Sequence, residues 1–152
     1  MFKIVTLKCV VYKYQTGFYV HCRKEIFMTN FDIKHLGCLA NLADKENGKV
    51  FLHDILNLSS CEVSINCVPK GFKLPFNHKH KQNEEIYLFL KGTGKMYLDG
   101  NGIDVKEGSC IKINPPVLRS FENTGDTDVQ FICIQAKANS LEQFGLSDAK
   151  VC

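Results

Sequence analysis

The sequence predicts a single domain with an all-β fold of the sandwich or barrel kind, and two observations support that prediction. From about residue 49 onward, short runs with strand patterning alternate with turn residues at the intervals typical of such folds. The chain has 152 residues, which is enough for one domain with its own hydrophobic core. Helix is expected only as a short peripheral element. No run of about 18 apolar residues occurs, so no membrane partner is expected.

Charge divides the chain near Met28. The formal net charge is +3, but residues 1–27 carry five basic side chains and one acidic side chain, which leaves the remainder close to neutral. Nucleic-acid binding is not expected, because no basic patch interleaved with aromatics occurs. We expect the following organisation: 1–27, an upstream extension or a poorly ordered arm outside the native domain; 28–57, N-terminal strands and their connection; 58–138, the barrel; 139–152, a C-terminal tail.

The first clear strands are expected at residues 61–67 and 86–90. The former alternates apolar with polar residues, which predicts one apolar and one polar face. That polar face is expected to be solvated, with a pocket lined by Glu62 or Asn66 as the alternative. The run at 86–90 is apolar on both faces, so both should be covered, the outer one by a second subunit.

Turn residues define the later strands. The segment 99–102, Asp-Gly-Asn-Gly, supplies the positive-φ residues that a tight hairpin after strand 95–98 requires. Pro115 and Pro116 end a strand at 109–113. Further strands are expected at 119–122 and 128–136.

Helix is expected in two places only. One is around residues 33–44, and the other is the tail, where Ser140 and Gln143 form a capping-box pattern. His53 is interpreted as a structural histidine within a strand.

The eight cysteines form no C-x-x-C pair, so neither a zinc ribbon nor a redox motif is expected. Cys61, Cys67 and Cys133 lie inside apolar strand-like runs, where a free cysteine behaves as a small hydrophobic residue. Buried thiols are typical of a reducing compartment, which predicts a cytoplasmic protein.

Candidate metal ligands lie beside an apolar strand. His78 and His80 are alternate residues and can point at one ion, to which Glu85 can return from the following strand. Two imidazoles and a carboxylate suit a divalent Fe, Mn, Ni, Zn or Cu ion and leave coordination positions open. The alternative is a solvated His-Lys-His-Lys segment, since H-x-H alone is a weak signal.

The same residues resemble the first motif of the cupin superfamily, which is a glycine, H-x-H, three or four residues, a glutamate, six residues and a glycine. His78, His80, Glu85 and Gly92 match it. Glu84 also satisfies the looser spacing, but only Glu85 leaves six residues before Gly92. Glu85 is therefore the expected ligand.

The second cupin motif, a glycine, a proline-containing turn, a histidine, three residues and an asparagine, is also present. Gly108, Pro115 and Asn123 match it, but Arg119 stands where the histidine is usual. The resemblance covers about residues 58–136. It implies a double-stranded β-helix, or jelly roll, commonly dimeric, with the site inside the barrel. Strand parity with Glu85 then places Tyr87 and Phe89 on the interior face as substrate contacts.

Arg119 cannot ligate a metal, because a guanidinium offers no lone pair. Its planar fork suits a substrate carboxylate or phosphate. Three interpretations stay open: an anchor beside a three-ligand metal centre, an anion sensor whose metal is weak or absent, or a structural ion pair with Glu84 or Glu85.

These observations predict a cupin-type metal-binding protein, an oxygenase or an isomerase or epimerase acting on a small anionic metabolite. The alternative is a non-catalytic homodimer that binds or senses a small molecule. A purely structural dimer is a third interpretation.

Overall fold

The computed structural model describes residues 5–14, 17–26, 31–38, 41, 48–145 and 148–151. Two compact units divide the chain, Met1–Ile33 and Lys34–Cys152. The first contains an antiparallel hairpin of β1 (Val5–Tyr14) and β2 (Gly17–Ile26). That residues 1–27 lie outside the native domain stays a prediction.

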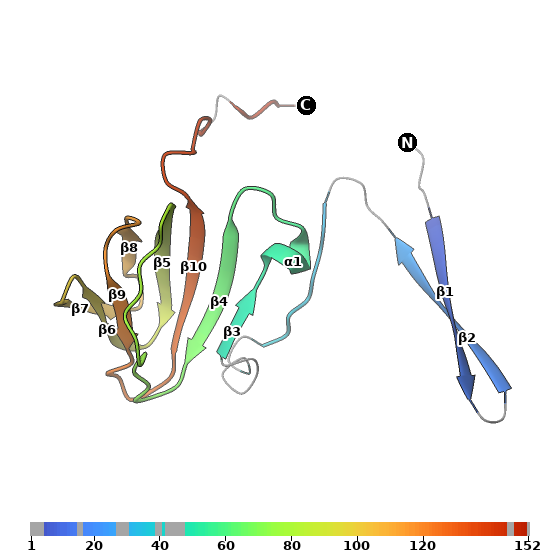
Figure 1. The fold of residues 1–152 in the computed structure, drawn as a ribbon, viewed down its shortest axis with the longest axis horizontal. Coiled ribbons are helices and arrows are strands. Elements are labelled where there is room, and N and C mark those ends of the chain that lie inside the picture. Colours follow the sequence, from blue (N-terminus) through green and yellow to red (C-terminus); the bar gives the residue numbers. More distant parts are fainter. Residues whose placement is uncertain are drawn as a thin grey trace. The chain divides into compact units, whose positions relative to one another are not determined.

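The second unit is built from two antiparallel sheets, which confirms the all-β prediction. A five-stranded sheet has the order β3-β4-β10-β5-β8, and a three-stranded sheet has the order β7-β6-β9 (Figure 1). The strands are β3 Lys49–Phe51, β4 Glu62–Val68, β5 Asn83–Lys91, β6 Thr93–Leu98, β7 Asn101–Lys106, β8 Cys110–Ile113, β9 Arg119–Glu122 and β10 Val129–Lys137.

An aromatic core joins the two sheets. Phe89 and Phe131 from the five-stranded sheet meet Phe121 from β9, with ring centroids 5.3 to 5.8 Å apart. Met96 from β6 and Val105 from β7 are buried in the same cluster. Burial of these apolar side chains is the main favourable contribution to folding.

Strand register determines which polar groups share the interior with this core. β10 pairs with β5 so that Gln135 lies opposite Glu85 and Cys133 lies opposite Tyr87. Because side chains alternate along a strand, all four occupy the inner face of the sheet. The register therefore stacks a polar layer directly above the aromatic core.

The polar face of β4 is not solvated, contrary to the expectation for residues 61–67. Ser64 and Asn66 are buried, because β10 places Cys133 and Phe131 opposite them on the inner face. The Asn66 amide is satisfied locally, donating to the Ser64 carbonyl (3.2 Å) and the Ser64 hydroxyl (3.1 Å). The burial of these two polar side chains therefore depends on the pairing of β4 with the central strand β10, and the polarity of the β4 residues does not predict it.

The outer face of β5 is apolar and only partly covered. Ile86 and Leu88 are half-buried and Leu90 is 42% exposed, while Ile132 and Ile134 of the neighbouring β10 are half-buried. A second subunit as the cover of this face stays a prediction.

The hairpin between β6 and β7 has the expected turn. Asp99 (φ 48°) and Gly100 (φ 83°) both adopt positive φ, as a two-residue turn between twisted strands requires. Residues 95–98, 109–113, 119–122 and 128–136 also lie in or overlap strands as predicted.

The predicted helices are wrong where the structure describes them. Residues 33–38 and 140–145 contain no helix, while a short helix not foreseen, α1 (His53–Leu56), begins at the histidine expected in a strand. Ser140 donates its hydroxyl to the Lys137 carbonyl instead of capping a helix (2.7 Å). So short a segment needs tertiary packing to be helical, and Leu141 and Phe144 are both 74% exposed.

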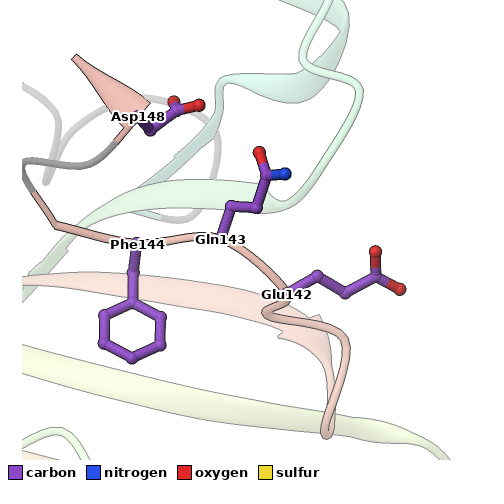
Figure 2. Close-up of a pocket in the computed structure, with 4 residues that line it drawn as sticks. All are labelled: Glu142, Gln143, Phe144 and Asp148. Carbon is purple, nitrogen blue, oxygen red and sulfur yellow. The ribbon is translucent and has the colours of Figure 1, made fainter.

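In the tail, a pocket is lined by Glu142, Gln143, Phe144 and Asp148, and the side chains of Phe144 and Gln143 point to opposite sides (Figure 2).

Within the described part of the chain, no helix is both long and apolar enough to cross a bilayer.

Gly92→Ala should destabilise the protein more than Gly108→Ala, although both glycines have a φ near +83°. A Cβ at Gly92 would lie 2.8 Å from the Asp128 carbonyl oxygen and 3.0 Å from a Val129 methyl, whereas the space at Gly108 is open. We expect a loss of about 1–2 kcal/mol for Gly108→Ala from backbone strain and about 1–3 kcal/mol more for Gly92→Ala from overpacking. Urea unfolding measures both, and equal losses would contradict the close approach.

Candidate metal centre

The segment before β5 carries the two histidines to the edge of β9. The backbone of His78 exchanges two hydrogen bonds with Arg119, N–H to carbonyl at 3.0 and 2.8 Å. This bridge fixes the direction in which the His78 ring leaves the chain, and His80, two residues later, leaves on the same side. The His78 and His80 ring centroids lie 5.6 Å apart.

The three predicted ligands come together. Donor atoms of His78, His80 and Glu85 all lie within 4.8 Å of one another. His80 Nε2 is 3.1 Å from Glu85 Oε1. Among the described residues, His78 Nδ1 is buried and has no hydrogen-bond partner. Buried polar atoms are ordinarily hydrogen-bonded, so this nitrogen has lost its contact with water and has gained no bond in exchange.

The two oxygens of Glu85 have different partners. Oε2 accepts hydrogen bonds from Arg119 Nη1 (2.7 Å) and the Tyr87 hydroxyl (3.0 Å). Oε1 faces His80 and accepts from Gln135 Nε2 (3.0 Å) and, more weakly, from the Cys133 thiol (3.5 Å). Oε2 is therefore occupied by a cation, and Oε1 faces uncharged donors and an imidazole.

Arg119 is held almost completely inside the protein, at 1% exposure. Its Nη2 donates to three backbone carbonyls of the preceding turn, those of Asn114, Pro115 and Val117, at 2.9, 3.2 and 3.0 Å. Of the interpretations left open for Arg119, the ion pair with Glu85 is present in the structure. Contact with a ligand stays a prediction.

The environment sets the protonation of the site. Burial works to raise the pKa of Glu85, but the hydrogen bond from Arg119 and the charges of His80 and Arg119 outweigh it and hold that pKa below the ordinary carboxyl value. Burial lowers the pKa of His78, despite attraction from Glu85. The site therefore offers an ionised carboxylate and a neutral imidazole at neutral pH, the forms that bind metals.

Burial raises the pKa of Tyr87 far above its ordinary value, with the neighbouring Cys133 and Glu85 adding to the effect. Tyr87 thus stays a neutral hydrogen-bond donor to Glu85.

These residues fit a transition-metal ion. Two imidazoles and one carboxylate form a donor set used by catalytic metal sites with open positions, and the uncompensated His78 Nδ1 would gain a partner. Glu85 would use Oε1, because Arg119 and Tyr87 occupy Oε2. Residues that hydrogen-bond to the free oxygen of a metal-binding carboxylate, as Arg119 and Tyr87 do here, commonly orient such ligands.

The remaining predicted residues occupy distinct places. Tyr87 belongs to the site through its bond to Glu85, whereas Phe89 packs one layer deeper in the aromatic core, and its contact with a substrate stays a prediction. Glu84 points to the outer face and pairs with Lys112 (3.3 Å). His53 is exposed and pairs with its neighbour Asp54.

Sequence reasoning missed Cys133 and Gln135 of β10 and also Asn83, whose amide donates to Gln135 Oε1 (3.2 Å). The alternation of Phe131, Cys133 and Gln135 indicated a shared face, but only the pairing of β10 with β5 places that face against Glu85.

Comparison with known proteins gives a consistent result. The family model of the cupin domain matches residues 65–135. A crystal structure of a cupin protein from Bacteroides fragilis is 38% identical, with a TM-score of 0.72, and the alignment covers 82% of this chain and 99% of that one. The likeness confirms the expected double-stranded β-helix.

Two curated proteins also match over shorter stretches. An uncharacterised protein from Methanocaldococcus jannaschii is 41% identical over 66 residues, 43% of this chain and 52% of that one. An oxalate-binding protein from Thermotoga maritima is 35% identical over 57 residues, 38% of this chain and 47% of that one. The chain thus spans about half the length of the curated relatives it matches.

Arg119→Met should lower the free energy of unfolding by about 3–5 kcal/mol, because it leaves the Glu85 carboxylate buried without its cation. The double variant Glu85→Gln/Arg119→Met should lose less than Arg119→Met alone. Denaturant unfolding of metal-free protein measures both. Lys112→Met, which breaks the half-exposed pair with Glu84, is the matched control and should change stability little. A loss at Arg119 no larger than at Lys112 would contradict the importance of the buried pair.

Proposed function

Because this chain belongs to the cupin superfamily, we propose that it holds a divalent transition metal through His78, His80 and Glu85 and acts there on a small anionic molecule. The observation that carries the proposal is the convergence of donor atoms of His78, His80 and Glu85 within 4.8 Å of one another. His78 also has a buried ring nitrogen, Nδ1, that finds no hydrogen-bond partner within the described part of the chain. The ion would be Fe, Mn, Ni, Zn or Cu.

Charge balance supports an anionic ligand. The Arg119 guanidinium already neutralises the Glu85 carboxylate, and histidines that bind metal are neutral. A dication would therefore add positive charge that no side chain of the His-His-Glu-Arg set offsets, in a largely buried place where isolated charge is costly. A small carboxylate would offset it. The Thermotoga maritima relative is named an oxalate-binding protein, which agrees with this class of ligand.

The residues around the proposed metal also support a catalytic role. A bound metal supplies Lewis acidity or activates oxygen. Tyr87 and Gln135 present neutral donors beside Glu85, and Arg119 keeps Oε2 in place, with its Nε buried and unpartnered among the described residues. These residues would orient the anion, which supports a metal-dependent oxygenase or an isomerase or epimerase.

A second candidate is a non-catalytic cupin that binds or senses a small molecule with little or no metal. The observation that favours it is that Arg119, Tyr87, Gln135 and Cys133 satisfy Glu85 without any ion.

We further propose that the protein is a homodimer in a reducing compartment such as the cytoplasm. The apolar outer face of β5 supports an interface between copies. Cys38, Cys61, Cys110 and Cys133 carry free thiols, which supports the reducing compartment.

Protein purified without added metal or chelator should contain about one transition-metal ion per chain, because three protein ligands suffice to hold an ion with open positions. His78→Ala/His80→Ala should lose it. His53→Ala, an exposed histidine in α1, is the matched control and should retain it. Elemental analysis by mass spectrometry measures the content. Protein that carries no metal, even after reloading, would contradict a metal centre.

Calorimetric titration with oxalate separates the two candidates. If the metal holds the anion, His80→Ala should abolish oxalate binding together with metal binding. Unchanged binding of oxalate by metal-free His80→Ala would support the sensing protein instead.

Leu90→Glu should convert the dimer to a monomer, because it places a charge in the proposed apolar interface. Ile103→Glu in β7 is the matched control, since Ile103 is 43% exposed and Leu90 42%, and it should leave the dimer intact. Sedimentation velocity measures the mass. A monomeric unmodified protein would contradict the dimer.

A further inference from the structure

The β1–β2 hairpin places two cysteines directly across from each other (Figure 1). Cys9 of β1 is paired with Cys22 of β2 in an unbroken antiparallel register. Their spacing along the chain does not reveal this pairing, which depends on the turn between the strands. Elsewhere in the described strand pairings no cysteine lies opposite another: the partners are Gln130 for Cys67, Ser64 and Tyr87 for Cys133, and Leu88 for Cys110.

The register determines which kind of pair the two cysteines form. Tyr14 and Gly17 are the paired residues on either side of a two-residue connection, and residues in that place exchange both of their backbone hydrogen bonds. Hydrogen-bonded and non-hydrogen-bonded pairs then alternate along an antiparallel ladder. Cys9 and Cys22 are each five positions from this first pair, which is an odd number of steps, so they form a non-hydrogen-bonded pair.

A non-hydrogen-bonded pair of this kind has the backbone spacing that a disulfide needs. Its Cα atoms are about 4.5 Å apart, and directly opposite residues come closest in such pairs. A disulfide joins residues whose Cα atoms are about 4.4–6.8 Å apart. A bond between Cys9 and Cys22 therefore requires no change in the register of the hairpin.

The charge of this segment favours the reactive form of a thiol. Residues 1–27 carry five basic side chains and one acidic side chain. Positive surroundings favour the thiolate, which is the nucleophile in disulfide exchange. In the barrel, by contrast, burial raises the pKa of Cys133 to about 12, which keeps that thiol protonated. We therefore expect the hairpin cysteines to react before Cys133.

We propose that Cys9 and Cys22 form a reversible disulfide that locks the β1–β2 hairpin in its register when the surroundings become oxidising. With glutathione disulfide as the oxidant, one cysteine thiolate attacks a glutathione sulfur and releases one glutathione. The other cysteine thiolate then attacks the cysteine sulfur of the mixed disulfide and releases the second glutathione. The cysteines lose two electrons, glutathione disulfide gains them, and both thiol protons end on the released glutathione. This inference does not depend on the proposed metal centre.

Peptide mapping of the full chain tests the proposal. The protein is equilibrated with reduced and oxidised glutathione, its free thiols are alkylated, and it is digested with trypsin without reduction. Because trypsin cleaves after Lys8, Lys13 and Arg23, the two cysteines fall in separate peptides, 9–13 and 14–23. We expect mass spectrometry to find these peptides joined by a disulfide, and to find them separate after reduction. Cysteines in both peptides that are alkylated, or joined to glutathione or to another cysteine, would overturn the proposal.

A change of register separates strand pairing from random encounter of two nearby thiols. In Cys9→Val/Val11→Cys the cysteine of β1 is placed opposite Val20 and no longer opposite Cys22. Its equilibrium constant for disulfide formation against glutathione should be at least about tenfold lower than in the unmodified protein, because disulfide geometry is strict. Adding Cys22→Val/Val20→Cys recreates a directly opposite, non-hydrogen-bonded pair and should restore the constant. Equal constants in all three proteins would overturn the role of the register.

Discussion

The Glu85–Arg119 ion pair lies where three parts of the barrel meet. β5 contributes the carboxylate, β9 contributes the guanidinium, and the turn between β8 and β9 supplies three carbonyls to the other end of that guanidinium. The backbone of Arg119 also holds His78 in place through two hydrogen bonds. Any movement of Arg119 would therefore displace a proposed metal ligand, so the geometry of the site depends on this pair.

The same ion pair determines the net charge of the site. Glu85 is ionised but already compensated, and its second oxygen faces Gln135, Cys133 and His80. Because its two oxygens have different partners, the Glu85 carboxylate can bind a metal ion through Oε1 while Arg119 holds Oε2. Hydrogen-bonding neighbours commonly orient metal ligands in this manner. Because the cation is permanent, the metal's own charge is left for other anions to offset. That constraint favours the proposed anionic ligand.

The amino-acid sequence predicts the strands of the barrel, the Asp99–Gly100 hairpin and the inward direction of Glu85, because these depend on local alternation and turn chemistry. The burial of Ser64 and Asn66 and the approach of Cys133 and Gln135 to Glu85 depend on which strands pair and in which register. That pairing joins residues about 50 positions apart and leaves no local signal. The capping pattern at Ser140 was misleading, because a cap alone cannot stabilise so short and exposed a helix.

The most direct test of this account is a crystal structure of the metal-loaded protein with diffraction recorded across the absorption edge of the bound metal. We predict an anomalous peak in contact with His78, His80 and Glu85 Oε1, while Arg119 remains bonded to Glu85 Oε2. A peak elsewhere, or an Arg119 that has left Glu85 to make room for the ion, would contradict a carboxylate shared between the guanidinium and the metal.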